Sequence, residues 1–280
     1  MAALAPIANV FWLGGGCGSG KTTLARVLTR RLDLRLYPID GYTYAHVERS
    51  KRGGFPLTRA SAEMMPEQRW HAAPADLAER FAAVAAERLE MILADLRDLG
   101  PGPTVVAEGP QLFPDLIAPL MQTPKHGLWL LPTPEFGQHG VAGRRAGGLT
   151  GEAAQRRRDR DVLLTGMNRR QLRRYGLPSA DVDGNRSLAD TIEMVAERLT
   201  SLPGGLVRAT DGGQRRLIRQ AENAVAVRQL LGWWAELGRE QMPDAPPFPF
   251  SCECETLGCE QTVTMSVIEY QRRSADGPVT

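Results

Sequence analysis

The feature that most constrains this chain is a glycine-rich segment close to its N-terminus. Residues 14–23 read Gly-Gly-Gly-Cys-Gly-Ser-Gly-Lys-Thr-Thr, between an apolar run at residues 7–13 and a helix-like stretch at residues 22–32. The apolar run has the length of a buried strand, and glycine allows the backbone to turn sharply from a strand into a helix. A strand joined to a helix by so short a loop is typical of α/β folds built on a parallel sheet.

Within this segment, residues 15–22 spell G-x-x-x-x-G-K-T in the strand–loop–helix context that the motif requires. In such a loop, backbone N–H groups point at a polyphosphate, and the following helix adds the positive end of its dipole. We expect Lys21 to reach the β- and γ-phosphates and the Thr22 hydroxyl to ligate Mg²⁺. The sequence therefore predicts a nucleoside triphosphate site. Its predicted phosphate-binding residues are Gly15, Gly16, Cys17, Gly18, Ser19, Gly20, Lys21, Thr22 and Thr23.

Length and composition fit one large domain or a domain with an appendage. The 280 residues are 42% hydrophobic and 24% charged, with a net charge of +2, which argues against a broad nucleic-acid-binding surface. No apolar run approaches the roughly 20 residues that span a bilayer. The phosphate loop lies too near the N-terminus to leave room for a signal peptide, and four cysteines do not suggest a secreted disulfide framework. We expect a cytoplasmic protein without membrane partners.

Strand-like and helix-like segments alternate along the chain, which predicts a parallel sheet covered by helices. Further strands are expected at residues 34–39, 104–107, 127–131 and 179–182, and further helices at 76–99, 188–199 and about 214–239. The polar stretch at residues 41–74 is too long for a simple connection and is expected to carry function or to be a solvated loop. We predict a nucleotide-binding domain at residues 1–202 and an extension at residues 203–280.

Three acidic residues follow predicted strands, where ligands bind in open α/β sheets. Asp40 suits a general base that takes the proton of an attacking hydroxyl, or a ligand of Mg²⁺, although aspartate before glycine also forms turns. Glu108 ends an apolar strand and is predicted to hold the Mg²⁺ shell. Asp183 begins a loop predicted to face the nucleotide base, or it caps the next helix, as Ser187 also could. The predicted base-facing residues are Asp183, Gly184 and Arg186.

Together these segments resemble the P-loop small-molecule kinases, the group of nucleoside monophosphate kinases, shikimate and gluconate kinases, and uridine kinase. The resemblance covers about residues 5–200. It implies a three-layer α/β/α fold with five parallel strands in the order 2-3-1-4-5, Asp40 as the base, and Glu108 as a Mg²⁺-shell or substrate ligand. It also implies a mobile lid in the arginine-rich stretch after the fourth strand. The lid candidates are Arg144, Arg145, Arg156 and Arg157.

The expected activity is transfer of the γ-phosphate of ATP to a hydroxyl of a small molecule, assisted by Mg²⁺. The preference for ATP over GTP comes from the resemblance. The alternative is an ATPase that acts as a nucleotide-dependent switch with a protein partner. An end-processing polynucleotide kinase is a weaker alternative because the net charge is nearly neutral.

Three cysteines near the C-terminus form a second motif. Cys252, Cys254 and Cys259 have the spacing C-x-C-x₄-C. A structural zinc site takes four ligands, so the fourth would be a carboxylate, Cys17 or a group from another subunit. Packed or redox-sensitive thiols are the alternative.

Overall fold

The computed structural model describes residues 7–65, 68–137, 150–236, 238 and 247–280. Its centre is a parallel five-stranded sheet with the order β2-β3-β1-β4-β5, as predicted. The strands are β1 (Val10–Gly15), β2 (Arg35–Pro38), β3 (Val105–Glu108), β4 (Gly127–Pro132) and β5 (Ser179–Val182). β1 begins three residues later than expected because Asn9, at φ 63°, has a left-handed backbone that a strand does not contain.

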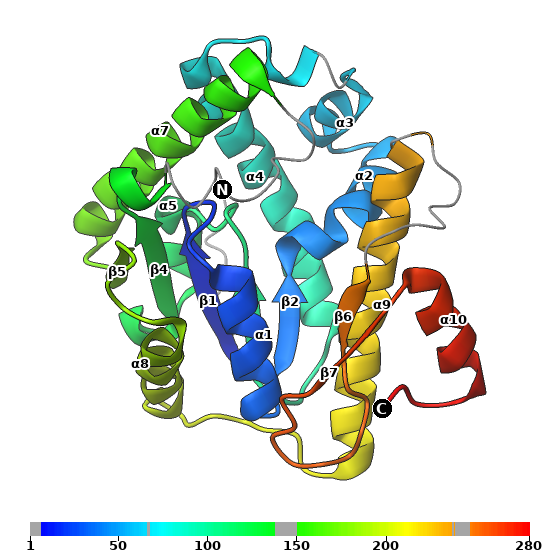
Figure 1. Ribbon diagram of the computed structural model, residues 1–280. Helices are drawn as coiled ribbons and strands as arrows, with labels where there is room; N and C mark the ends of the chain where they lie inside the picture. The colour runs from blue at the N-terminus through cyan, green and yellow to red at the C-terminus, as the bar shows by residue number, and fades with distance from the viewer. Residues whose placement is uncertain (1–6, 66–67, 138–149, 237, 239–246) are drawn as a thin grey trace.

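Helices cover both faces of this sheet (Figure 1). Because side chains alternate along a strand, neighbouring residues of β1 belong to opposite layers. Phe11 packs in the cluster formed with α1 (Lys21–Arg31) and α8 (Leu188–Thr200), whereas Trp12 packs in the cluster formed with α4 (Pro74–Asp98). The shorter elements on the second face are α5 (Pro114–Ile117) and η3 (Ala118–Leu120). The short helix η4 (Pro124–His126) precedes β4, and its Pro124 oxygen accepts from Arg198 of α8. The fold is therefore a three-layer α/β/α sandwich.

The polar stretch at residues 41–74 is largely helical, which differs from the loop considered in the sequence analysis. It forms η1 (Ile39–Tyr42), α2 (Thr43–Lys51), α3 (Pro56–Glu63) and η2 (Gln68–Trp70). The Glu87 carboxylate on α4 accepts hydrogen bonds from the first backbone N–H groups of α3, at 2.9 Å from Leu57 N and 2.6 Å from Thr58 N. A residue about thirty positions away thus caps α3, and the local sequence alone does not reveal such a cap.

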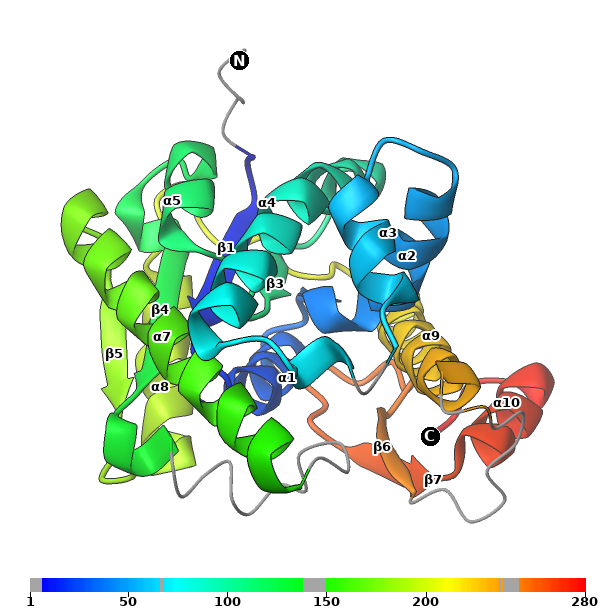
Figure 2. The ribbon, with the colours of Figure 1, turned by 90° about the horizontal axis from the view of Figure 1, so that it is seen from above.

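The C-terminal part forms a smaller packed unit beside the sheet (Figure 2). It contains α9 (Gly212–Glu236), an antiparallel pair of β6 (Phe248–Ser251) and β7 (Thr262–Met265), and α10 (Val267–Asp276). These elements share a hydrophobic cluster that includes Trp234, Phe250 and Tyr270. The predicted boundary at residue 202 stays a prediction. Among the described residues, no helix is both long enough and apolar enough to cross a membrane.

α9 connects this unit to the end of α1. The buried Arg219 guanidinium donates to the backbone oxygens of Thr29 at 2.9 Å and Arg30 at 3.2 Å, and it lies 3.6 Å from the Asp33 carboxylate. A cation at the C-terminus of a helix satisfies carbonyl groups that have no partner within the helix. α9 is therefore fixed to the helix that begins at the phosphate loop.

Candidate active site

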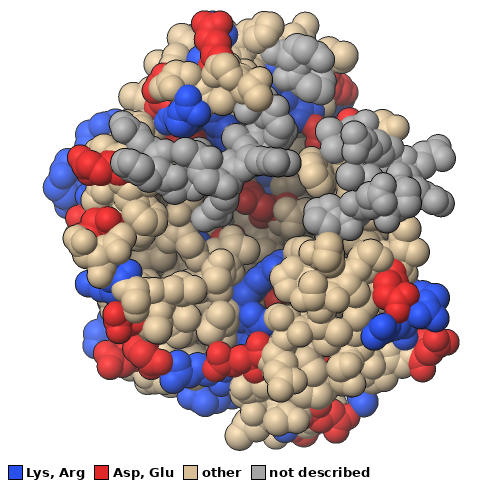
Figure 3. Space-filling view, in the orientation of Figure 1, with Lys and Arg blue, Asp and Glu red and all other residues tan. Residues whose placement is uncertain are grey.

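Register across the sheet brings the predicted site residues to one edge. Leu13 of β1 is paired with Glu108 of β3, and Glu108 is paired with Pro38 of β2. The chain that leaves β1 is the phosphate loop, and the chain that leaves β2 carries Asp40 two residues later. Glu108 therefore ends the strand that lies between these two segments. On the side of the molecule seen in Figure 3, basic and acidic side chains lie in a central hollow.

The phosphate loop has a shape that only glycine permits at several positions. Gly15, Gly18 and Gly20 have φ of 122°, 80° and 83°, in the region that side chains disfavour. A Cβ on Gly15 would lie 2.0 Å from the Leu130 carbonyl oxygen, so β4 approaches the loop too closely for any side chain. The Gly20 N-cap then leads directly into α1. The structure thus joins the predicted loop to a strand and a helix as the motif requires.

Lys21 is buried, yet its charge is not matched by a carboxylate at hydrogen-bond distance. Its Nζ donates to the Gly16 carbonyl oxygen at 2.6 Å and to Ser19 Oγ at 3.3 Å. Within the described ranges, Lys21 makes no salt bridge. A buried ammonium held only by neutral oxygens is suited to binding an anion.

Glu108 lies near both Lys21 and a second carboxylate, that of Asp40. Burial and the nearby negative charge of Asp40 raise the pKa of Glu108 to about 7, although Lys21, a hydrogen bond from Thr22 and Arg26 act in the opposite direction. Asp40 accepts a hydrogen bond from Gln111 Nε2 at 2.6 Å. Two carboxylates and a hydroxyl are hard oxygen donors of the kind that Mg²⁺ takes. A cation would also relieve the repulsion between the acids, so these residues fit a Mg²⁺ ion.

Asp40 does not end β2 as predicted but lies in the short helix η1 that follows it. α9 packs against this turn, and a Cβ on Gly41 would lie 2.5 Å from Val225 Cγ1. Tyr42, at the end of η1, stacks on Tyr37 of β2 with ring centroids 4.3 Å apart. Residues beyond position 200 therefore hold the turn that carries Asp40, a role that the sequence did not indicate.

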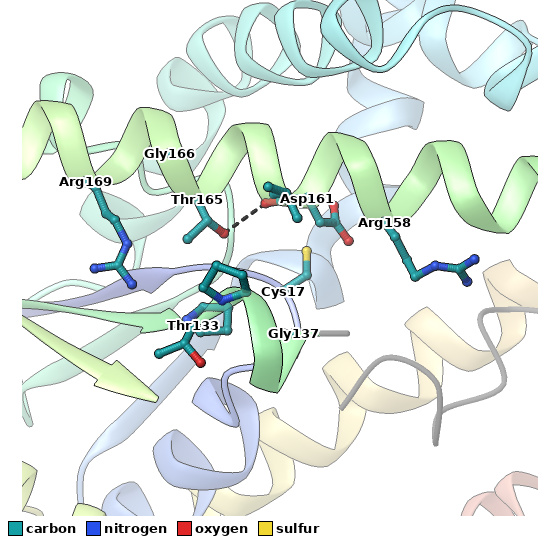
Figure 4. A pocket seen from close by; sticks show the side chains of 11 residues that line it. Cys17, Thr133, Gly137, Arg158, Asp161, Thr165, Gly166 and Arg169 are labelled. Carbon is teal, nitrogen blue, oxygen red and sulfur yellow. Dashed lines mark hydrogen bonds between the residues drawn. The ribbon is translucent and has the colours of Figure 1, made fainter. Parts of the chain in front are cut away.

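A pocket of about 220 Å³ lies between the phosphate loop, the end of β4 and α7 (Gly151–Tyr175), as Figure 4 shows. Cys17 and Asp161 point toward one another in it. Burial and the Asp161 charge raise the pKa of the Cys17 thiol to about 11, so this thiol is neutral near pH 7. Asp161 Oδ2 is buried and makes no hydrogen bond, whereas Oδ1 accepts from Arg160. Asp161 was not among the predicted site residues, because a single acid within an arginine-rich run has no distinctive sequence pattern.

The predicted lid arginines are only partly described. Arg144 and Arg145 lie outside the described residues. Arg156 donates to the backbone oxygens of Trp70 at 3.2 Å and His71 at 2.8 Å, so it connects α7 to the segment after η2. Arg157 lies over the Trp70 ring. A catalytic role for Arg156 and a lid role for these side chains stay predictions.

The predicted base loop is exposed at the end of β5. The Asp183 carboxylate accepts from Asn185 N and Asn185 Nδ2, and the backbone hydrogen bond leads the interactions that lower the pKa of Asp183. Ser187, not Asp183, caps α8 by accepting from Asp190 N. Asp183, Gly184 and Arg186 line a shallow pocket beside β5. Their contact with a nucleotide base stays a prediction.

A separate polar cluster lies under the helices that the sequence analysis treated as a loop. The Asp95 carboxylate accepts from Tyr37 Oη at 2.6 Å, His46 Nε2 at 2.9 Å and Arg49 Nη2 at 2.5 Å. Burial raises the pKa of Asp95, but these hydrogen bonds outweigh it, and the net shift is downward. His46 Nδ1 in turn accepts from the buried Arg88. Each charge in this cluster has a protein partner.

The three C-terminal cysteines lie together. One sulfur from each of Cys252, Cys254 and Cys259 lies within 4.8 Å of the others, so the group could hold a metal ion. Among the described residues, Cys17 does not belong to this group, which removes it as the fourth ligand considered in the sequence analysis. Cys17 lines the pocket beside α7 instead.

Comparison with known proteins adds little. No protein-family model matches the chain, and no curated protein matches it. Among solved structures, the crystal structure of TT1252 from Thermus thermophilus aligns over 71% of this chain and 100% of that chain, with 19% identity and a TM-score of 0.41. A similarity at this level says nothing about what this chain binds or does.

Proposed function

We propose that this protein transfers the γ-phosphate of ATP to a hydroxyl of a small molecule, with Mg²⁺. The observation that carries this proposal is the register of β1, β3 and β2, which sets the phosphate loop and Asp40 on either side of Glu108. A phosphate-binding loop beside a metal-binding acid and a second acid is the set of groups that phosphoryl transfer to an alcohol needs.

Each residue has a distinct role in this proposal. The loop backbone and Lys21 bind the β- and γ-phosphates, and Thr22 and Glu108 hold the metal. Asp40 orients the acceptor hydroxyl and accepts its proton, and its hydrogen bond to Gln111 fixes the carboxylate for this task. When bound, Mg²⁺ neutralises charge on the phosphate oxygens. Asp183, Gly184 and Arg186 contact the base, and the preference for ATP follows from the family resemblance.

The substitution Asp40→Asn tests the role of the base. We expect transfer to fall by about 10²- to 10⁴-fold, the usual contribution of a general base, while binding of Mg·ATP changes by only a few-fold. Calorimetry measures the binding of Mg·ATP. The rate of ADP release measures the transfer. Asp181→Asn is the matched control, because Asp181 is more than half exposed on β5 and pairs with Arg169. Loss of ATP binding in Asp40→Asn would assign this residue to the metal or to the fold instead.

A nucleotide-dependent switch is the second candidate. It is favoured by the contact of the C-terminal unit with both α1 and the Asp40 turn, since Arg26 of α1 lies over the Phe248 ring of β6 and Val225 of α9 packs against Gly41. A switch would hydrolyse ATP slowly, would respond to no acceptor, and would bind a protein partner in only one nucleotide state. ADP release with and without acceptors separates the two candidates.

A further inference from the structure

The loop that joins β6 to β7 places three thiols at one point. Ser251 of β6 pairs with Thr262 of β7, and Cys252 N donates to the Gln261 oxygen at 3.1 Å, so the hairpin ladder continues to the base of the loop. The three sulfurs within 4.8 Å of one another all come from this loop. With a Zn–S bond of about 2.3 Å, tetrahedral thiolates on one ion are about 3.8 Å apart. The thiols therefore need little movement to share an ion.

One side of the loop is anchored by a glutamate between two of the cysteines. Glu253 is fully buried. Its carboxylate accepts from Tyr270 Oη at 2.6 Å, Asn223 Nδ2 at 2.8 Å and Val279 N at 2.9 Å. Those donors come from α10, α9 and the C-terminal segment, so the backbone at Cys252 and Cys254 is held by three separate parts of the unit.

The other side of the loop is anchored to the turn after α1. Gly258 N donates to both oxygens of the Asp33 carboxylate, at 3.3 and 3.2 Å. Gly258 has φ of 60°, and a Cβ there would lie 3.1 Å from the Arg31 carbonyl oxygen. This glycine allows the loop to approach α1 closely and fixes the position of Cys259 beside it. Metal ligands held by such outer contacts are preorganised.

We propose that Cys252, Cys254 and Cys259 bind one Zn²⁺ through three thiolates, with the fourth position taken by water. Thiolates select soft or borderline metals such as Zn²⁺ over Mg²⁺. The three carboxylates adjacent in sequence to the cysteines are engaged elsewhere. Glu253 accepts the hydrogen bonds described above, Glu255 pairs with Arg216 at 2.7 Å, and Glu260 lies 4.0 Å from Arg31. In the described part of the chain no carboxylate or imidazole joins the three thiols.

The site would fasten the C-terminal unit to the core. β6 and β7 have four residues each, and an isolated pair of such strands is marginally stable. Small units of this kind commonly gain stability from a structural metal. Because the loop is bonded to Asp33, the ion would stabilise the turn between α1 and β2.

Metal content and cobalt spectroscopy test the proposal without any activity assay. The protein is purified in a thiol reductant without chelator, and its zinc is measured by mass spectrometry. We expect about one Zn²⁺ per chain. Replacement by Co²⁺ should give a thiolate-to-cobalt charge-transfer band with the intensity of three thiolates. Cys259→Ser should lower metal affinity at least tenfold, whereas the control Cys17→Ser should keep both metal and band.

Either of two results would contradict the proposed zinc site. One is wild-type protein without zinc that also gives no charge-transfer band when the chelator-treated protein is titrated with Co²⁺. The other is a disulfide between two of these cysteines, found by peptide mapping of protein purified under reducing conditions. The wild-type titration decides the question even where Cys259→Ser does not fold.

Discussion

Two acids, the part-buried Asp95 and the buried Glu108, have pKa shifts in opposite directions. Asp95, under α2, accepts hydrogen bonds from Tyr37, His46 and Arg49, and these lower its pKa despite burial. Glu108, at the end of β3, is buried beside a second acid, and its pKa rises to about 7. The fold thus satisfies the charge of Asp95 and compensates that of Glu108 only in part, through Lys21, Thr22 and Arg26. Unmatched charge in a cleft marks a site for a ligand, whereas matched charge marks structure.

A large loss of activity should also come from removing Lys21, the cation whose hydrogen bonds are only to neutral oxygens. Lys21→Ala removes the ammonium expected on the β- and γ-phosphates, so turnover of ATP should fall by about 10²- to 10³-fold, as for loss of one charge-stabilising donor. Lys51→Ala is the control, because Lys51 is exposed and pairs with the exposed Glu48 three residues earlier. Steady-state ADP release measures both variants. Equal rates in both would remove Lys21 from the site.

Asp95→Ala should affect stability and leave nucleotide binding intact. It removes the shared partner of Tyr37, His46 and Arg49, and breaking a largely buried polar cluster costs about 2–4 kcal/mol. Denaturant unfolding measures this loss. Glu48→Ala, which breaks an exposed pair on α2, the helix that carries His46 and Arg49, should cost less than about 0.5 kcal/mol. An unchanged unfolding free energy in Asp95→Ala would show that the cluster is not structural.

The pH dependence of Mg·ATP binding tests whether Glu108, unlike Asp95, has a raised pKa. The raised pKa means that apo Glu108 is largely protonated below pH 7, and Mg²⁺ must displace that proton. Affinity should therefore rise about tenfold per pH unit below pH 7 and level off above it. Glu108→Gln cannot release a proton, so the variant should lack this component. The titration of ATP itself is common to both proteins and cancels in their comparison.

The raised pKa of Glu108 also predicts how the stability of the metal-free protein changes with pH. Because the folded pKa of about 7 lies above the unfolded value of about 4.5, ionisation opposes folding, and stability falls as pH rises between these values. Glu108→Gln should remove that slope in unfolding experiments. If the stability of wild type and variant changed with pH in the same way, the pKa of Glu108 would not be raised by folding.

The sequence predicted those parts of the site that depend on contiguous residues. The phosphate loop and the acid at the end of an apolar strand are local patterns. The alternation of strands and helices predicted a parallel sheet, and the family resemblance implied its strand order. The cap of α3 by Glu87 and the Asp95 cluster join residues about thirty to sixty positions apart. Support of the Asp40 turn by Val225 spans more than 180 positions. No local propensity encodes such pairings, so only the folded chain shows them.

ADP release by the purified protein with Mg²⁺, with and without a panel of hydroxylated acceptors, tests the central claim most directly. The panel should contain nucleosides, sugars, polyols and hydroxylated antibiotics. We predict that one class stimulates ADP release, that the phosphate appears on its hydroxyl, and that Lys21→Ala lowers both by about 10²- to 10³-fold. Slow ADP release that no acceptor changes would contradict transfer to a small molecule and would favour the nucleotide-dependent switch.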